Sequence, residues 1–266
     1  KDLVGFHSVI NLFSGLASVT GHKGSHPRIM GGPFPDAVSG CYCVLALLEA
    51  LYHRAYTREG QHIEVAMTEV LATILPEAVM EYSLDGTEPE RVGNRHQEKA
   101  PHGVFRCTGD QNWVAISVES DIQFRALAKI AGSPRWADDP RFSTTEARLS
   151  HQDELEPLIE QWTEGLPVQE VVESLQAAGV PAGPALDSAQ VLADPHMVQR
   201  GFVQSPDHQV VGPRPMGAFS WTVNGVQLAI PRSAPLLGEH NKKVMQELLQ
   251  VPDEEFERLL ENGVIR

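Results

Sequence analysis

Cysteines are scarce in this 266-residue sequence. Three of them, Cys41, Cys43 and Cys107, are too few for a disulfide framework, and their odd number favours reduced thiols. Cys41 and Cys43 lie closer together than the CxxC spacing of zinc and redox sites, and no further cluster of ligand residues lies nearby. We therefore expect free cysteines and no metal site.

Positive charge is also in short supply. The sequence has 21 Lys and Arg against 35 Asp and Glu, which gives a formal net charge of −14. Nucleic acids and anionic lipid surfaces require a basic face on their partner, so we expect neither a nucleic-acid nor a membrane partner. The balance still allows a local basic pocket for one phosphorylated small molecule.

Long apolar runs are missing as well. The longest unbroken run covers residues 41–48, whereas a membrane-spanning helix needs roughly 20 apolar residues. We expect this run to be a buried element. Residues 1–10 lack the basic and long apolar regions of a secretory signal. A cytoplasmic protein is therefore expected.

The sequence has the composition of a globular protein, with 42% hydrophobic and 21% charged residues. Apolar residues at 44, 47, 48 and 51 have the spacing of one helix face and predict a helix over 36–59. Alternation predicts a strand at 61–67, and residues 68–86 indicate a helix kinked at Pro76. Two apolar runs, 103–107 and 112–118, predict a β-hairpin.

These patterns predict two domains of different composition. The fold class we expect is α/β, with a larger helix-rich α/β domain and a smaller α+β domain. Residues 1–90 are assigned to the larger domain, residues 91–200 to the smaller one, and residues 201–266 to a return into the larger one.

Asp36 is the first candidate for chemistry, because it stands near the start of the helix predicted at 36–59. Free backbone N–H groups and the positive end of the helix dipole keep a carboxylate ionised at such a position. The preceding segment, GGPFP at 31–35, is a stiff turn whose bare glycines let a ligand approach. A positioned carboxylate can attack an activated acyl group. The residues alone equally allow an ordinary N-cap.

A series of segments resembles the family III CoA-transferases, the CaiB/BaiF type. These segments follow one another in the order typical of the family, and together they span nearly the whole chain. They are FHSVINLFSGLASVTG (6–21), GGPFPDAVSG (31–40), ALLEALYHRAYTREGQHIEVAM (46–67), GNRHQEKAPHGVFRCTGDQNWVAISV (93–118), AGVPAGPAL (178–186), DPHMVQRGF (194–202) and APLLGEHN (234–241).

The resemblance implies that Asp36 is the catalytic aspartate. It would attack the thioester of an acyl-CoA donor and form an aspartyl anhydride, which the CoA thiolate converts to an aspartyl-CoA thioester. A carboxylic acid acceptor then completes the transfer. No tightly bound cofactor is implied, since coenzyme A enters as part of the substrate. A site that excludes water and orients the carboxylate toward the thioester carbonyl would accelerate this attack.

The resemblance also suggests which other residues bind the substrate. His7 would line the thioester pocket, and Met67 would touch the acyl group. The segment 93–103 takes the place of a glycine-rich loop that closes over the intermediate in formyl-CoA transferase. Its candidate binding residues are Gly93, Asn94, Arg95 and His102. A plain connector between domains is the alternative for this loop.

Two other functions stay open. α-Methylacyl-CoA racemases of this family use a histidine as an acid–base group, and counting back from Ser14-Gly15 places that position on Phe6, one residue before His7. Phe6 cannot take an α-proton, which favours transfer over epimerisation. A non-catalytic half of a split or two-domain transferase is the other alternative.

The resemblance covers only the C-terminal two-thirds of the family pattern. Family members open with a Rossmann-like segment that carries the basic residues for CoA phosphates, and that segment is not in this sequence. We expect most of the CoA contacts to lie there. The family also implies a homodimer, or here a partner that supplies the N-terminal half.

Overall fold

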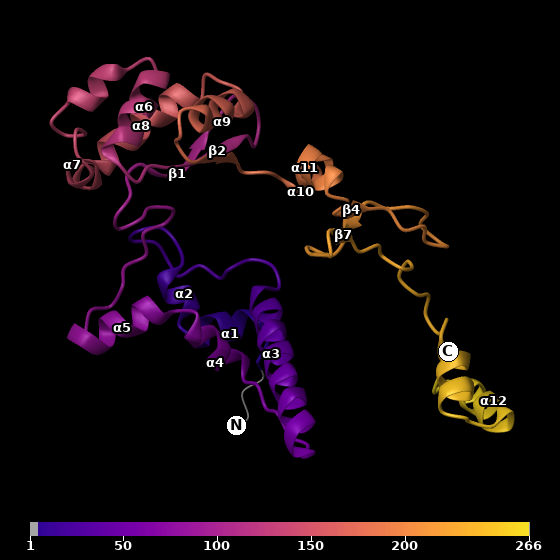
Figure 1. The fold of residues 1–266 in the computed structure, drawn as a ribbon. Coiled ribbons are helices and arrows are strands. Elements are labelled where there is room, and N and C mark those ends of the chain that lie inside the picture. Colours follow the sequence, from indigo (N-terminus) through magenta and orange to yellow (C-terminus); the bar gives the residue numbers. More distant parts are fainter. Residues whose placement is uncertain (1–4, 266) are drawn as a thin grey trace. The chain divides into compact units, whose positions relative to one another are not determined.

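The computed structural model describes residues 5–265. The chain divides into two compact units, Lys1–Ala185 and Leu186–Arg266 (Figure 1). The predicted boundary at residue 200 thus lies inside the second unit. The assignment of residues 201–266 to the larger domain stays a prediction.

The first unit begins with a group of helices around a small apolar core. Buried Ile10, Leu16 and Leu71 form this core, and Phe34 and Met67 are among the residues packed against it. The helices are α1 (His7–Phe13), α2 (Leu16–Val19), α3 (Phe34–Thr57), α4 (Met67–Thr73) and α5 (Pro76–Asp85). The helix predicted at 36–59 is confirmed by α3.

The strand predicted at 61–67 is wrong. The chain between α3 and α4 has no regular structure, and Met67 is the first residue of α4. Alternating side chains form a strand only where a second strand completes the hydrogen bonds, and none of the described strands pairs with this segment. No strand lies within residues 5–90, so this region is helical and not α/β.

The single kinked helix predicted for 68–86 is two helices. α4 ends at Thr73, and Pro76 is the first residue of α5. Proline has no N–H to donate and its φ suits the first helical position, so it starts a new helix here more easily than it bends an existing one.

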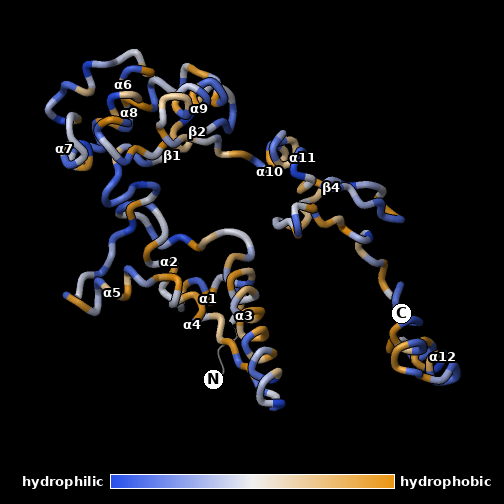
Figure 2. The backbone as a smooth tube through the Cα atoms, viewed as in Figure 1, coloured by the Kyte–Doolittle hydropathy of each residue, from blue (hydrophilic) through white to orange (hydrophobic). Residues whose placement is uncertain are grey.

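The expectation that the α3 apolar face is buried is also wrong. Val44, Leu47, Leu48 and Leu51 expose 56%, 51%, 58% and 40% of their surface, and apolar residues recur along α3 in Figure 2. By length and composition α3 could cross a membrane, a test that core helices of water-soluble proteins also pass. The absence of a membrane partner stays a prediction.

The second part of the first unit is a small antiparallel sheet with helices packed on it. The strand order is β1 (His102–Arg106), β2 (Trp113–Ser117) and β3 (Ala182–Pro184). β1 and β2 pair with His102 opposite Ser117, so the predicted hairpin is confirmed. The accompanying helices are α6 (Asp121–Ile130), the 3₁₀-helix η1 (Pro134–Asp138), α7 (Thr145–Ser150), α8 (Gln152–Thr163) and α9 (Val168–Ala177).

The inner face of this sheet forms the larger core of the unit. Phe105, Val114 and Ile116 point toward buried side chains of α6, α8 and α9, such as Leu127 and Ile159. Most of these side chains are fully buried, so each contributes about 1.5–3 kcal/mol to the stability of the unit. Along the sequence, the residues of the two cores lie before and after the boundary predicted between residues 90 and 91.

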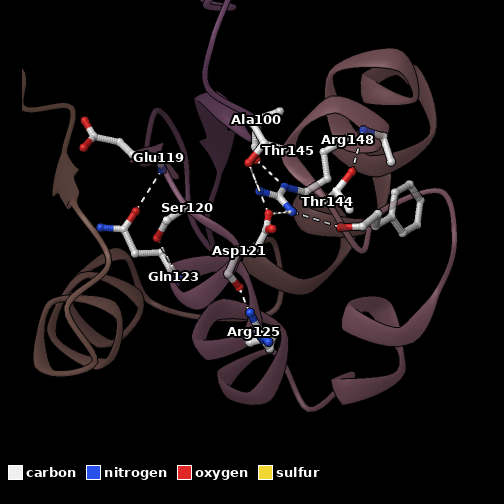
Figure 3. A network of polar contacts seen from close by, with 11 residues as sticks. Ala100, Glu119, Ser120, Asp121, Gln123, Arg125, Thr144, Thr145 and Arg148 are labelled. Atoms are coloured by element: carbon white, nitrogen blue, oxygen red, sulfur yellow. Dashed lines mark hydrogen bonds and ion pairs between the residues drawn. The ribbon is translucent and has the colours of Figure 1, made fainter.

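A charged residue, Arg148, is completely buried beside this core. Its guanidinium donates hydrogen bonds to the carbonyls of Ala100 and Phe142 and to the side chains of Asp121 and Thr145 (Figure 3). Arg148 therefore ties the chain just before β1 to the start of α6 and to α7.

The second unit has little core, and Phe256 is the one buried residue among those described in it. Its first helix is held by a capping box between Asp187 and Gln190. The elements are α10 (Ser188–Ala193), α11 (Pro195–Gln199), β4 (Val203–Gln204), β5 (Met216–Gly217), β6 (Thr222–Val223), β7 (Val226–Gln227), the π-helix η2 (Lys243–Leu248) and α12 (Asp253–Glu261). β4 pairs with β5 and β6 with β7, both antiparallel.

Candidate active site

Asp36 is the third residue of α3, and Pro33 holds the N-cap position. The ordinary N-cap alternative is therefore not what the structure has. Pro33 and Pro35 have no N–H, so this helix start offers fewer amides that could bind the carboxylate than a usual one. The Asp36 side chain is 55% exposed, and its described partner is another side chain, His7. The carboxylate is thus open to an incoming ligand.

His7, the first residue of α1, lies beside Asp36. Its Nδ1 is 3.9 Å from Oδ2 of Asp36, and its Nε2 is 3.1 Å from the backbone carbonyl of Met30. Met30 directly precedes the Gly31-Gly32 turn that leads into α3. The turn therefore links the carbonyl that contacts the histidine ring to the helix that carries the aspartate.

Two further polar side chains near this pair were not identified from the sequence. Asn11 is fully buried on α1 and donates from Nδ2 to the carbonyl of His7 at 3.1 Å. Ser39 is buried one turn after Asp36 on α3. Asn11 Oδ1, Ser39 Oγ and His7 Nδ1 are buried without a hydrogen-bond partner among the described residues. Such groups are rare in folded proteins and tend to mark functional positions. The available signal was a polar Asn11 between Ile10 and Leu12.

Met67 packs against the same small core as Phe34 and Met30. Phe34 is the first residue of α3, two positions before Asp36. The structure thus places Met67 in the core that supports the Asp36 turn, and its contact with an acyl group stays a prediction.

The other predicted binding residues lie together in a different place. Gly93, Asn94, Arg95 and His102 line a cleft of about 560 Å³ over the sheet, together with Val104, Ala115, Ile116, Ser117, Pro181, Ala182, Gly183 and Gly103. Three of them, Asn94, Arg95 and His102, also line a neighbouring cleft of about 940 Å³ next to α8. Neither cleft is lined by Asp36, His7 or Met67. The predicted site residues therefore form two groups.

Arg95 is engaged with acidic side chains. Its Nε and Nη2 donate to the two carboxylate oxygens of Glu156 at 2.8 and 2.6 Å, and Nη2 also contacts Asp153 at 2.5 Å. The hydrogen bonds with Glu156, and then those with Asp153, raise the pKa of the Arg95 guanidinium. Two carboxylates balance its charge, so Arg95 would have to leave them to bind a CoA phosphate.

Gly93 holds the start of this loop in a left-handed conformation. Its φ is +67°, and a Cβ at this position would lie 2.9 Å from Nδ1 of His22. Its N–H donates to the carbonyl of Gly21 at 2.8 Å, which joins two segments far apart in the sequence. The position requires glycine for its backbone and for the space beside it.

We expect Gly93→Ala to destabilise the first unit by about 2 kcal/mol, from left-handed strain and the contact with His22. Gly132→Ala is the matched control, because Gly132 has φ +68° but open space around it. Thermal unfolding should show the larger loss for Gly93→Ala. Equal losses in the two variants would show that the His22 contact contributes nothing.

The fold belongs to a known class of CoA-dependent proteins. A crystal structure of a CaiB/BaiF family protein from Brucella suis matches with a TM-score of 0.82 and 30% identity, over 92% of this chain and 63% of that one. The structure of Rv3272 from Mycobacterium tuberculosis shows the same fold at 21% identity, with a TM-score of 0.70. The profile of CoA-transferase family III matches residues 1–241. The chain belongs to CoA-transferase family III, as its sequence segments indicated.

Several similar proteins are named as CoA-transferases. The succinyl-CoA–D-citramalate CoA-transferase of Chloroflexus aurantiacus is 31% identical over all of this chain and 66% of its own length. The succinate–glutarate CoA-transferase of Agrobacterium fabrum is 33% identical over 93% of this chain and 61% of its own length. The formyl-CoA:oxalate CoA-transferase of Streptomyces avermitilis is 31% identical over 99% and 68%. The chain thus spans about two-thirds of the length of these relatives.

Proposed function

We propose that this chain carries the nucleophile of an enzyme that moves CoA from an acyl-CoA donor to a small carboxylic acid. Asp36 attacks the thioester carbonyl carbon, the C–S bond breaks, and the electron pair leaves with the CoA thiolate. The resulting aspartyl anhydride reacts with the thiolate to give an aspartyl-CoA thioester and the free donor acid. The acceptor carboxylate then runs the same steps in reverse.

The observation that supports this best is the exposed carboxylate of Asp36, whose described partner is His7. It lies in the first turn of a 24-residue helix, where the positive end of the helix dipole favours a negative charge, yet it does not serve as a cap. The donor and acceptor acids of the relatives named above are small carboxylic acids, which is the substrate class we propose here. A cytoplasmic homodimer completes the proposal.

α-Methylacyl-CoA epimerisation is the second candidate, and the position of His7 favours it. The histidine places a second proton-accepting group beside Asp36, as removal and return of an α-proton requires. Epimerisation in D₂O without an acceptor acid would introduce deuterium at the α-carbon of the acyl-CoA. Transfer would not.

Mass spectrometry of the intact protein tests the transfer reaction directly. Incubation with succinyl-CoA should add the mass of CoA, less one water, to Asp36, and peptide mapping should place the adduct there. Hydroxylamine should remove it, since thioesters and anhydrides react with this nucleophile. Unchanged protein mass together with deuterium in the recovered acyl-CoA would favour epimerisation instead. If neither the adduct nor the deuterium is observed, the chain is a non-catalytic part of a larger enzyme.

A further inference from the structure

The histidine beside Asp36 has two different ring nitrogens in two different surroundings. Nε2 lies 3.1 Å from the carbonyl oxygen of Met30, and Nδ1 lies 3.9 Å from a carboxylate oxygen of Asp36. Which nitrogen carries the hydrogen decides what the ring can do at the site.

The Met30 contact determines where that hydrogen is. A carbonyl oxygen can only accept, so the 3.1 Å contact is a hydrogen bond only when Nε2 carries the hydrogen. The Asn11 amide also comes near Nε2, at 3.4 Å, but its shorter contact at 3.1 Å is with the carbonyl of His7. Asn11 thus has an acceptor of its own and does not require a bare Nε2.

Nδ1 is then left with a lone pair and no hydrogen-bond partner, and it is buried. Its separation from Asp36 is about 1 Å longer than an ordinary hydrogen bond. A small side-chain movement would close it. Protonation at Nδ1 would turn it into a donor toward Asp36 while the bond from Nε2 to Met30 stays in place.

We propose that His7 acts on Asp36 through Nδ1, and that the carbonyl of Met30 orients the ring for this by holding the hydrogen on Nε2. The inference rests on the proposed role of Asp36 as the reacting carboxylate. Nδ1 is the atom through which the protonated ring donates a hydrogen bond to the carboxylate, while Nε2 keeps its bond to Met30. Met30 is a positioning residue, and it acts through its backbone, so no side-chain pattern in the sequence indicates it.

Two substitutions separate the ring nitrogens. The amide of asparagine reaches as far from the backbone as Nδ1, and the amide of glutamine reaches as far as Nε2. His7→Gln therefore keeps a group for Met30 and loses the one that faces Asp36, and His7→Asn does the reverse. Acylation of Asp36 by succinyl-CoA, followed by intact mass, is expected to slow about 10- to 100-fold in His7→Gln, the range for losing a hydrogen bond to a charged group.

His7→Asn should retain most of the rate. His53→Gln on α3 is the control, because His53 contacts only Thr57 in its own helix among the described contacts. A His7→Gln variant that reacts like the unmodified chain, or a His7→Asn variant that is slower than His7→Gln, would overturn the proposal.

A second measurement needs no substrate. Two-bond ¹H–¹⁵N spectra of the labelled chain distinguish the two neutral tautomers, and the His7 signals are assigned by their absence in His7→Asn. We expect the tautomer with hydrogen on Nε2. Hydrogen on Nδ1 would overturn this inference even if Asp36 is acylated, whereas an unreactive Asp36 would overturn the proposed function and leave the tautomer unaffected.

Discussion

Replacing Asp36 by alanine is expected to abolish the CoA adduct and to lower CoA transfer by about 10⁴-fold or more, as loss of a nucleophile does in other enzymes. No anhydride can form without the carboxylate, and the hydrophobic side chains nearby offer no substitute. Asp36→Asn should fail equally, because its amide keeps the shape but is not a nucleophile. The measurements are initial rates of transfer from succinyl-CoA and intact mass.

The structural cost of this change should be small. Asp36 makes no cap bond, so alanine loses an acidic residue in the first turn and the exposed 3.9 Å contact with His7, each about 0–1 kcal/mol. Glu77→Ala in the first turn of α5 removes the same kind of dipole interaction and serves as the control. Its rate should match that of the unmodified chain. Appreciable transfer by Asp36→Ala would exclude the aspartyl mechanism.

The parts of the fold that the sequence predicted well are those with strong local signals. α3 has a helical apolar stripe and two prolines near its start, so its limits agree within two residues. The β1–β2 hairpin follows from two apolar runs separated by a glycine-containing turn.

The strand prediction at 61–67 failed because alternation is a local property of the sequence, whereas a strand forms only with a partner from elsewhere in the chain. Alternation specifies which side chains share a face, but a ladder needs a neighbour, and the neighbour is decided by the whole chain. The expectation that the apolar face of α3 is buried failed for a related reason. Its apolar spacing indicates a face that suits a partner, and spacing alone does not say which part of a protein supplies one.

The site was predicted unevenly for the same reason. Asp36 and His7 were predicted because family segments carry them, and the structure brings them within 3.9 Å of each other; their roles stay a prediction. The Met30 carbonyl and the buried Asn11 were missed, since a backbone group and a polar residue within an apolar stripe gain their meaning only from a distant contact. Arg148 has no sequence signal that distinguishes it from an exposed cation, yet it is completely buried.

Replacing Arg148 by methionine is expected to be the most destabilising single change considered for this chain. Methionine fills similar space but removes the hydrogen bonds to two backbone carbonyls and two side chains, and the guanidinium that lies 4.5 Å from the centre of the Phe124 ring. Removing one member of a buried ion pair costs about 3–5 kcal/mol. In a unit of this size the melting temperature should fall by roughly 10 °C.

Arg141→Met is the matched control for this prediction. Arg141 also pairs with two acidic residues, Asp139 and Glu154, and lies over the ring of Phe142, but its side chain is 49% exposed. Exposed pairs contribute about 0–1 kcal/mol, so its melting temperature should change by only a few degrees. Similar losses in the two variants would contradict the role assigned to burial.

The stability effect of Arg148→Met should also depend on pH, through Asp121. Burial by itself would raise the pKa of Asp121, but hydrogen bonds from Arg148 and Thr145 outweigh it and lower that pKa below its usual 3.8. A carboxyl group with a lowered pKa stabilises the fold above its unfolded-state pKa, and this contribution is lost as the pH falls through the folded-state pKa.

Arg148→Met removes the main hydrogen-bond donor to Asp121. The difference in stability between the unmodified chain and Arg148→Met should therefore narrow as the pH falls below about 4. It should not vanish, because the bonds from Arg148 to the carbonyls of Ala100 and Phe142 do not titrate in this range. Arg141→Met keeps the Asp121 contribution. If the difference in stability between the unmodified chain and Arg148→Met stays constant down to low pH, the ion pair with Asp121 contributes nothing to that difference.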